Sequence, residues 1–310
     1  MFIEINKYVH KYIIILSLKY KNGEMAMKWR DYADDVNLFE DFDKTIKPLT
    51  DEQRRKNINT LIAYFSKEVP SKIYNLSNDE IKPRDILRGL LNVYPPKEIA
   101  PEILNMLHNL LLIECEEREL VDVNDIEEVE EGIAIWRGNI TNLRADAIVN
   151  AANNKLLGCL QPLHLCVDNE IHSCAGPRLR EDCDKIIKKQ GHLEYTGDAK
   201  ITRGYCLPAK FVVHTVGPIV SGGQPSKEQE KQLLHCYKSC LNTIKEIDEI
   251  KNIVFCGIST GVFGYPKKEA ANLAVSRVRL WLKENPEKNL KVVFNVFTEE
   301  EEEKYRRIFK

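Results

Sequence analysis

The sequence predicts an α/β layer fold, in which helices cover both faces of a central sheet, preceded by a small all-helical domain. After Gly132, segments with strand patterns alternate with segments with helical patterns, which is typical of this fold class. Residues 28–120 instead carry apolar residues at helical spacing, without strand-like alternation. We therefore expect an uninformative extension over residues 1–27, a helical domain over 28–130 and the α/β domain over 131–310.

Three helices are predicted in the helical domain. Thr50 and Gln53 form a capping-box signature before the first helix. Pro83 and Pro101 suit the first positions of the second and third helices, and the third is expected to run to about Glu119. The acidic stretch 121–132 is the expected connection. Apolar stripes on the three helices predict a core, with substrate docking as the alternative; they comprise Ile58, Leu61, Ile62, Phe65, Ile86, Leu87, Leu90, Leu91, Ile103, Leu107, Leu110 and Leu111.

Strands and helices alternate in the α/β domain. Mostly apolar runs, of the kind that is buried on both faces of a sheet, predict strands at GIAIW, AIVNA, AKITR, FVVHTV, NIVFCGI and KVVFNVF. Helices are expected over 170–189, 226–246 and 266–284, and a last one after Thr298. The glutamates at 299–303 then fall in the first turn of that helix, where negative charge complements the helix dipole.

Composition and charge exclude several classes of protein. A formal charge of −2 over 310 residues leaves no basic surface for nucleic acid. The apolar run from Tyr12 to Leu18 is too short to span a bilayer, so no membrane association is expected. A weak signal-anchor is the alternative for this run, and translation starting at Met25 or Met27 is another explanation. An odd number of cysteines, nine, in a chain of this size favours a reducing, cytoplasmic location.

A cluster of metal-binding residue types lies between Asn150 and Gly176. Cys159, His164 and Cys166 fall within eight residues, a loop spacing that suits zinc. A structural zinc site normally has four protein ligands, whereas a catalytic site keeps one position open. Three ligands therefore favour a catalytic ion. Two inert thiols and a surface histidine are the alternative explanation.

A second loop carries glycines where a phosphate could bind. Gly261 and Gly264 follow the predicted strand NIVFCGI and precede a helix that begins near Pro266. Glycines permit backbone conformations in which successive N–H groups face an anion, and the helix adds the positive end of its dipole. Since open α/β sheets bind ligands beyond the carboxyl ends of their strands, we expect both loops at one site.

These motifs resemble the macrodomain family of ADP-ribose-binding modules, over roughly residues 131–310. The landmarks occur in the order WRGNIT, IVNAAN, DNEIHSCAG, TGDAKIT, LPAKFVVHTVGP and GISTGVFGYP. The resemblance implies a three-layer α/β/α macrodomain with a mixed central sheet. Hydrolytic macrodomains usually carry a glycine run between NAAN and the acid, but this chain has GCLQPLHLC, which is similar to the zinc-containing branch. A helical domain is a common N-terminal companion in that branch.

The resemblance also implies roles for individual residues. Cys159, His164 and Cys166 would bind a Zn²⁺ cofactor, and Asn153 and Asp168 would be the catalytic pair. Asp168 would orient or deprotonate the nucleophile, with zinc coordination as its alternative. Asn153 would hold the ribose, or else it only caps the end of the strand.

The remaining implied roles concern binding of ADP-ribose. The family has Asp where this chain has Asn139, so the hydrogen bond to the adenine amino group loses its charge assistance and weakens by about 1 kcal/mol. Ile140 would present its backbone to adenine. The diphosphate and distal ribose would be lined by Ser259, Thr260, Gly261, Val262 and Phe263. Further contacts are expected from Asn153, Val167, Asp168 and Tyr265.

By this resemblance the activity is hydrolysis of mono-ADP-ribose from protein side chains. Two alternatives stay open: a non-catalytic ADP-ribose reader with a structural zinc, and an O-acetyl-ADP-ribose deacetylase. The implied partners are the ADP-ribose moiety on a protein substrate, a sirtuin-like ADP-ribosyltransferase and a lipoyl-carrier protein.

Overall fold

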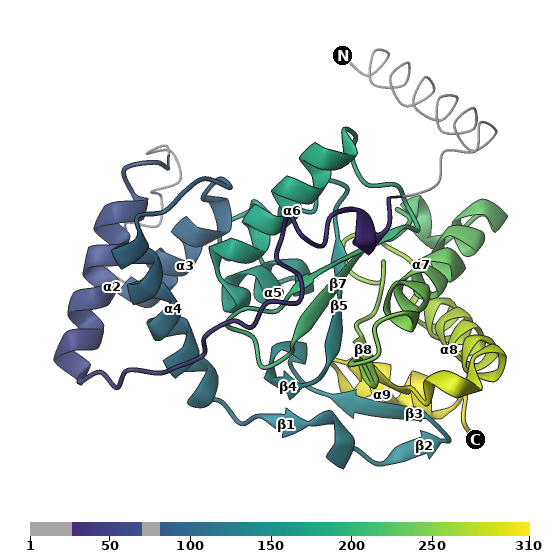
Figure 1. The fold of residues 1–310 in the computed structure, drawn as a ribbon. Helices are drawn as coiled ribbons and strands as arrows, with labels where there is room; N and C mark the ends of the chain where they lie inside the picture. Colours follow the sequence, from purple (N-terminus) through teal and green to yellow (C-terminus); the bar gives the residue numbers. More distant parts are fainter. Residues whose placement is uncertain (1–26, 70–80) are drawn as a thin grey trace.

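The computed structural model describes residues 27–69 and 81–310, and the predictions for residues 1–26 lie outside them (Figure 1). The N-terminal helices begin where the sequence predicts. The Thr50 hydroxyl accepts from the Gln53 N–H, and the Gln53 side-chain oxygen accepts from the Thr50 N–H, which confirms the capping box. Pro83 and Pro101 are the first residues of their helices. The elements are η1 (Trp29–Asp31), α2 (Asp51–Phe65), α3 (Pro83–Val93) and α4 (Pro101–Glu116).

The predicted apolar stripes of α2, α3 and α4 meet in one core. All of the predicted inward positions are buried in it except Ile62 and Ile86, which are partly buried and pack against it. Figure 1 shows these helices gathered on one side of the molecule, with α3 against α5 (Val167–Ala175). The core of the helical part is thus confirmed.

The α/β part is built on a mixed sheet, as predicted, but with seven strands in place of the six that the sequence predicts. Its order is β2-β3-β9-β8-β5-β7-β6. The five central strands are parallel to one another, and the edge strands β2 and β6 are antiparallel to β3 and β7. The strands are β2 (Glu128–Glu130), β3 (Ile133–Arg137), β5 (Ala147–Ala152), β6 (Ala199–Arg203), β7 (Phe211–Val216), β8 (Asn252–Phe255) and β9 (Lys291–Val296).

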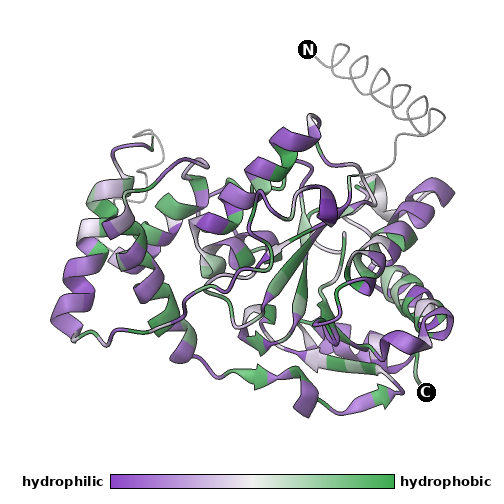
Figure 2. Ribbon diagram, in the orientation of Figure 1, coloured by the Kyte–Doolittle hydropathy of each residue, from purple (hydrophilic) through white to green (hydrophobic). Residues whose placement is uncertain are grey.

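Alternate residues of the strands supply two separate cores, as the side-chain period of a strand requires. Ile133, Val149 and Phe255 pack beneath α7 (Lys227–Lys245), α8 (Lys267–Glu284) and α9 (Glu299–Arg306). Ala134 and Ile148 face the other way, toward α5 and the start of α6 (Pro177–Gln190). In Figure 2 the central strands are hydrophobic and the outer helices carry hydrophilic residues. These are the two helical layers that the sequence predicts.

The acidic stretch 121–132 differs from the prediction, since it is more than a connection. It contains β2 and also β1 (Val121–Asp122), which pairs with β4 (Leu143–Arg144). Both outward-facing residues of β2 are exposed glutamates. Short, charged strands are tolerated at the edge of a sheet, where one side faces water, and alternation over three residues is too short to recognise in a sequence.

The helix predicted over 170–189 is wrong as one element. It is two helices, α5 and α6, which meet at Gly176. Proline disfavours a helical conformation in the residue before it, and Gly176 before Pro177 has φ 88° and ψ 176°. A Cβ at Gly176 would also lie 3.1 Å from Leu111 of α4. The break therefore lets α5 turn where it meets the helical part.

The predicted start of the last helix is confirmed. The Thr298 hydroxyl accepts from the Glu301 N–H, and the Glu301 carboxylate accepts from the Thr298 N–H. Glu299–Glu302 occupy the first turn. None of the helices in residues 27–69 and 81–310 is both long and apolar enough to cross a bilayer.

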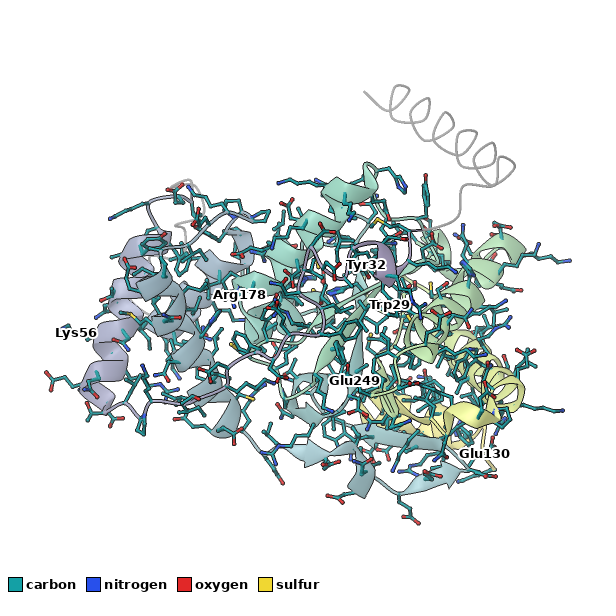
Figure 3. All side chains as sticks on the ribbon, in the orientation of Figure 1. Trp29, Tyr32, Lys56, Glu130, Arg178 and Glu249 are labelled. Atoms are coloured by element: carbon teal, nitrogen blue, oxygen red, sulfur yellow. The ribbon has the colours of Figure 1, made fainter. Side chains whose placement is uncertain are left out.

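Residues 32–38 pack into the sheet core, although the predicted boundaries assign them to the helical domain. Tyr32, labelled in Figure 3, Val36 and Leu38 belong to the same cluster as the sheet residues. The Tyr32 hydroxyl donates to Ile201 O (3.2 Å) and accepts from Ile201 N (2.8 Å), so it occupies backbone groups of the edge strand β6. The domain boundaries themselves stay a prediction.

Candidate functional site

Two loops leave neighbouring strands at the carboxyl edge of the sheet. Residues 153–166, which we call the metal loop, join β5 to α5, and residues 256–266, the phosphate loop, join β8 to α8. Because β5 and β8 are parallel neighbours, their carboxyl ends, and hence both loops, lie at the same edge.

The three predicted metal ligands come together in the metal loop. The ligand atoms of Cys159, His164 and Cys166 all lie within 4.8 Å of one another, and the three residues are half-buried. Cys159 Sγ lies 3.5 Å from His164 Nδ1. A sulfur and a nitrogen on one tetrahedral zinc ion are separated by about 3.6 Å. The donor set and its spacing therefore fit zinc.

Asn169 of α5 fixes the end of the metal loop. Its Nδ2 donates to His164 O (2.9 Å) and Gln161 O (3.3 Å). Its backbone N–H donates to Cys166 Sγ (3.4 Å), which makes the thiol the cap of α5. The buried Asn169 side chain thus holds the backbone at His164, and its backbone N–H holds the Cys166 thiol.

The predicted catalytic pair also comes together. Asn153 Nδ2 lies 3.5 Å from Asp168 Oδ2, and Asn150 donates to Asp168 Oδ1 at 2.8 Å. Burial raises the pKa of Asp168 to about 6, opposed by the Asn150 hydrogen bond and the charge of Arg180. Asn153 also accepts from Lys155 N (3.0 Å) and donates to Gly158 O (3.0 Å). It therefore organises the end of the strand as well as facing the carboxyl group.

A second, buried group of metal-binding residue types lies behind Asp168. The ligand atoms of His172, Cys183 and His214 are within 4.8 Å of one another, so this is a possible metal site. No local motif predicts this group, because the three residues come from α5, α6 and β7. Only the fold brings them together.

Hydrogen bonds already engage His214 in this buried group. An amide nitrogen can only donate, so His214 Nδ1 accepts from Asn150 Nδ2 (3.2 Å) and Nε2 carries the proton toward Thr202 Oγ1 (3.0 Å). Burial lowers the pKa of His214 to about 3 and that of His172 well below its ordinary value. Both imidazoles are therefore neutral near pH 7. The loop cluster has the more accessible ligand atoms of the two groups.

The phosphate loop presents backbone donors to the site. Gly264 N donates to Gly261 O (3.0 Å) and Tyr265 N to Ser259 O (2.9 Å), which closes the loop on itself. Within the described part of the chain, the N–H groups of Gly261, Val262 and Phe263 have no hydrogen-bond partner. Consecutive free N–H groups in a loop that leads into a helix are suited to an anion such as a phosphate.

Left-handed backbone makes this loop possible. Ser259 has φ 63° and Gly264 has φ 71°. A Cβ at Gly264 would lie 2.7 Å from Val220 O, and one at Gly217 would lie 2.0 Å from Ser259 Oγ. Glycine at 217 and 264 is therefore required for the loop to close against residues 217–220.

The predicted phosphate-loop residues differ widely in exposure. Val262 is 78% exposed and Phe263 is half-buried. Ser259 and Tyr265 are 5% and 2% exposed, and their hydroxyls have no partner among the described residues. Burial raises the pKa of Tyr265 to about 12. Tyr265 packs in the sheet core, and its contact with ADP-ribose stays a prediction.

Asn139, predicted to contact adenine, is held by neighbours. Its Oδ1 accepts from Thr141 N (3.0 Å) and Thr141 Oγ1 (2.9 Å), and its Nδ2 donates to Glu170 (2.8 Å). Glu170 also pairs with Arg88 of α3 at 2.6 Å. Both lone pairs of the amide oxygen are thus in use, and binding adenine there requires Thr141 Oγ1 to release one. Ile140 is buried beside it.

A cavity of about 310 Å³ lies away from both loops. It is lined by residues at the amino ends of the strands, among them Asp146, Lys210 and Asn252, and by Lys44 and Leu112 from the N-terminal part. None of the predicted site residues lines this cavity. Ligands of open α/β sheets bind at the opposite, carboxyl edge.

Comparison with known proteins gives one consistent picture. Residues 149–274 match the family model described as Macro domain. The chain is 41% identical over 262 residues to the protein-ADP-ribose hydrolase of Staphylococcus aureus (strain MRSA252), covering 84% of this chain and 93% of the relative. The relative of the same name from Treponema medium is 42% identical over 253 residues, covering 80% and 96%.

Solved macrodomain structures are also similar to this chain. The Trypanosoma brucei macrodomain in complex with ADP is 31% identical with a TM-score of 0.56, covering 69% of this chain and 92% of that one. The Oceanobacillus iheyensis macrodomain with ADP is 35% identical with a TM-score of 0.51, covering 59% and 92%.

Proposed function

This chain belongs to the macrodomain family, and from that premise we propose that it is a zinc-dependent hydrolase that removes mono-ADP-ribose from modified protein side chains. The observation that carries the proposal is the cluster of Cys159, His164 and Cys166 within 4.8 Å, two residues before Asp168. The relatives named above support the hydrolytic activity.

The metal loop would hold the cofactor. Two thiols and one imidazole are the donors that zinc prefers, and three protein ligands leave one position free. When bound, the ion would supply a Lewis acid that can hold a ribose hydroxyl or lower the pKa of a water molecule. Coordination by Asp168 is the alternative for that free position.

Asp168 and Asn153 would act on the distal ribose. Asn150 holds Asp168 Oδ1, so Oδ2, which faces Asn153, is the oxygen that orients or deprotonates the nucleophile. The Asn153 amide would hold the ribose beside it.

The rest of ADP-ribose would extend along the carboxyl edge of the sheet. The free N–H groups of residues 261–263 support a diphosphate there. Adenine would lie near Asn139 and Ile140. The remaining contacts in this proposal are Val167, Ser259, Thr260, Gly261, Val262, Phe263 and Tyr265.

The cellular setting is also a proposal. All nine cysteines are unpaired, which supports a reducing, cytoplasmic location. We propose ADP-ribosylated protein as the substrate, with a sirtuin-like ADP-ribosyltransferase and a lipoyl-carrier protein as partners.

The test compares ADP-ribose release from a mono-ADP-ribosylated protein before chelation, after chelation and after zinc is restored. Release should be lost on chelation, recovered with zinc and lost in Cys166→Ala. Cys240→Ala removes a thiol from α7 on the other face of the sheet and should keep release. Release at the wild-type rate without metal would reject the zinc dependence. Tight ADP-ribose binding without turnover would indicate a reader, and faster turnover of O-acetyl-ADP-ribose a deacetylase.

A further inference from the structure

The carboxyl end of α3 contacts the metal loop through one buried side chain. Asn92 is 1% exposed. Its Oδ1 accepts from the backbone N–H of Leu163 (3.0 Å) and from Asn169 Nδ2 (3.3 Å), and its Nδ2 donates to Ser173 Oγ (2.9 Å). The amide oxygen therefore serves the metal loop, and the amide nitrogen serves the packing of α3 on α5.

Arg180 of α6 ties the same end of α3 to the start of the loop. Its guanidinium donates to Leu91 O (2.8 Å), Tyr94 O (2.6 Å) and Asn92 O (3.0 Å) at the end of the helix. It also donates to Leu157 O (2.7 Å), two residues before Cys159. Arg180 is buried, so these carbonyl groups have lost water and depend on it.

The hydrogen bonds of Asn92 and Arg180 support the backbone next to all three candidate metal ligands. Leu163 immediately precedes His164 and has a left-handed backbone, with φ 55°. Such a conformation is unfavourable for a branched side chain, so it requires support, and Asn92 bonds its N–H. Asn169, which Asn92 also bonds, holds His164 O and Cys166 Sγ. Arg180 holds the backbone before Cys159.

We propose that α3 is part of the metal site and that Asn92 is a positioning residue, which sets the metal affinity by fixing the backbone at Leu163. This inference rests on the proposed function, because it assumes that Cys159, His164 and Cys166 bind zinc. A purely apolar contact would suffice to dock α3. A buried amide costs free energy unless it is bonded, and here its oxygen bonds only the loop and Asn169.

Ser173 provides the matched control. Ser173→Ala removes the bond from Asn92 Nδ2, and hence a polar contact between α3 and α5, together with the bond of the Ser173 hydroxyl to Asn169 O within α5 (2.6 Å). It leaves both bonds to Asn92 Oδ1 in place. Asn92→Ala removes all three bonds. Asn92→Asp keeps an acceptor oxygen for Leu163 N and should restore what Asn92→Ala loses. Full-length protein is used throughout, since α3 packs against α5.

The first readout is zinc affinity, measured by competition with a chelating indicator. Partners that orient a metal site typically contribute 10–100-fold in affinity, so we expect a loss of about that size in Asn92→Ala. Ser173→Ala and Asn92→Asp should stay within a few-fold of wild type. The absorption spectrum of Co²⁺-loaded protein should change in Asn92→Ala alone. Equal zinc affinity in Asn92→Ala and Ser173→Ala would overturn the inference.

The second readout needs no metal. In metal-free protein, hydrogen exchange at the Leu163 amide should accelerate in Asn92→Ala and stay slow in Ser173→Ala. Unchanged exchange in Asn92→Ala would overturn the positioning role even if zinc binding fell. Wild-type protein that keeps Leu163 protected but binds no zinc would instead reject the proposed function, and with it the consequence for metal affinity.

Discussion

The metal loop and the phosphate loop lie at the same edge of the sheet but are held in different ways. The phosphate loop is closed by its own backbone, through bonds such as Tyr265 N to Ser259 O, and by glycines at close approaches. The metal loop is held by side chains from other elements, Asn92, Asn169 and Arg180.

This difference indicates that phosphate binding and catalysis depend on different parts of the molecule. A backbone loop can bind a phosphate with few side-chain requirements, whereas three metal ligands must be fixed relative to one another and to Asp168. We therefore expect substitutions beside the metal loop to lower the rate of hydrolysis. Substitutions in the phosphate loop should instead lower the stability of that loop.

The largest expected effect is on the rate of hydrolysis. Asp168→Asn removes the proposed base but keeps the size of the side chain, so the rate of hydrolysis should fall by about 10²–10⁴-fold. The phosphate loop is untouched, and ADP-ribose affinity should change far less. Single-turnover kinetics and calorimetric binding measure the two effects. Asp184→Asn, at a partly buried position of α6 that pairs with Lys188, is the control. Equal losses of rate and affinity in Asp168→Asn would contradict the separation.

The next effect concerns the scaffold of the metal loop. Arg180→Lys cannot reach all four carbonyls, and each buried acceptor left unpaired costs about 1–3 kcal/mol. We expect the free energy of unfolding to fall by about 3 kcal/mol, measured by urea denaturation. Arg178→Lys, at the neighbouring arginine of α6 labelled in Figure 3, should change it by less than about 0.5 kcal/mol. Equal effects in both variants would show that the carbonyl network is unimportant.

The buried His214 behind Asp168 makes the free energy of unfolding depend on pH. The pKa of folded His214 is about 3, below the ordinary 6.5, so the unfolded chain binds more protons between these values. Stability from this group is complete above pH 6.5 and decreases as the pH falls. From pH 6.5 to 5 the loss is about 2 kcal/mol.

His214→Gln should remove this part of the pH dependence, although it also destabilises the protein at neutral pH. Urea denaturation at several pH values gives the slope for each protein. A slope in His214→Gln as steep as in wild type would contradict a neutral buried imidazole.

The smallest expected effect tests the phosphate loop. Gly264→Ala places a Cβ 2.7 Å from Val220 O at φ 71°, and strain of this kind costs about 1–2 kcal/mol. Gly261→Ala adds the same atom to the same loop with nothing within 4 Å, so its effect should be below about 0.5 kcal/mol. Thermal unfolding measures both. Equal melting temperatures would show that the close approach imposes no constraint.

Local patterns made much of this molecule predictable. Capping boxes at Thr50 and Thr298, first-turn prolines and apolar runs depend on residues a few positions apart, and the structure has those elements. The three candidate ligands lie within eight residues, so their proximity was predictable as well. The break at Gly176–Pro177 also has a local signal, because proline constrains the preceding residue.

The supports of the site could not be predicted from local patterns. Asn92 and Leu163 are 71 residues apart, and Arg180 lies 89 residues from Leu91. Neither Asn92 nor Arg180 was part of a recognisable motif. Their contacts with the metal loop depend on the packing of α3 against α5. The group of His172, Cys183 and His214 likewise combines two helices and a strand. Such side chains become recognisable only once the fold has placed them together.

The most direct test of the central claim is anomalous diffraction at the zinc absorption edge, from crystals of the protein with bound ADP-ribose. The proposed function predicts one peak between the Cys159 and Cys166 sulfurs and the His164 imidazole, next to the distal ribose, with no fourth protein ligand. A peak closed by a fourth side chain away from the ribose, or no peak in protein that hydrolyses its substrate, would contradict it.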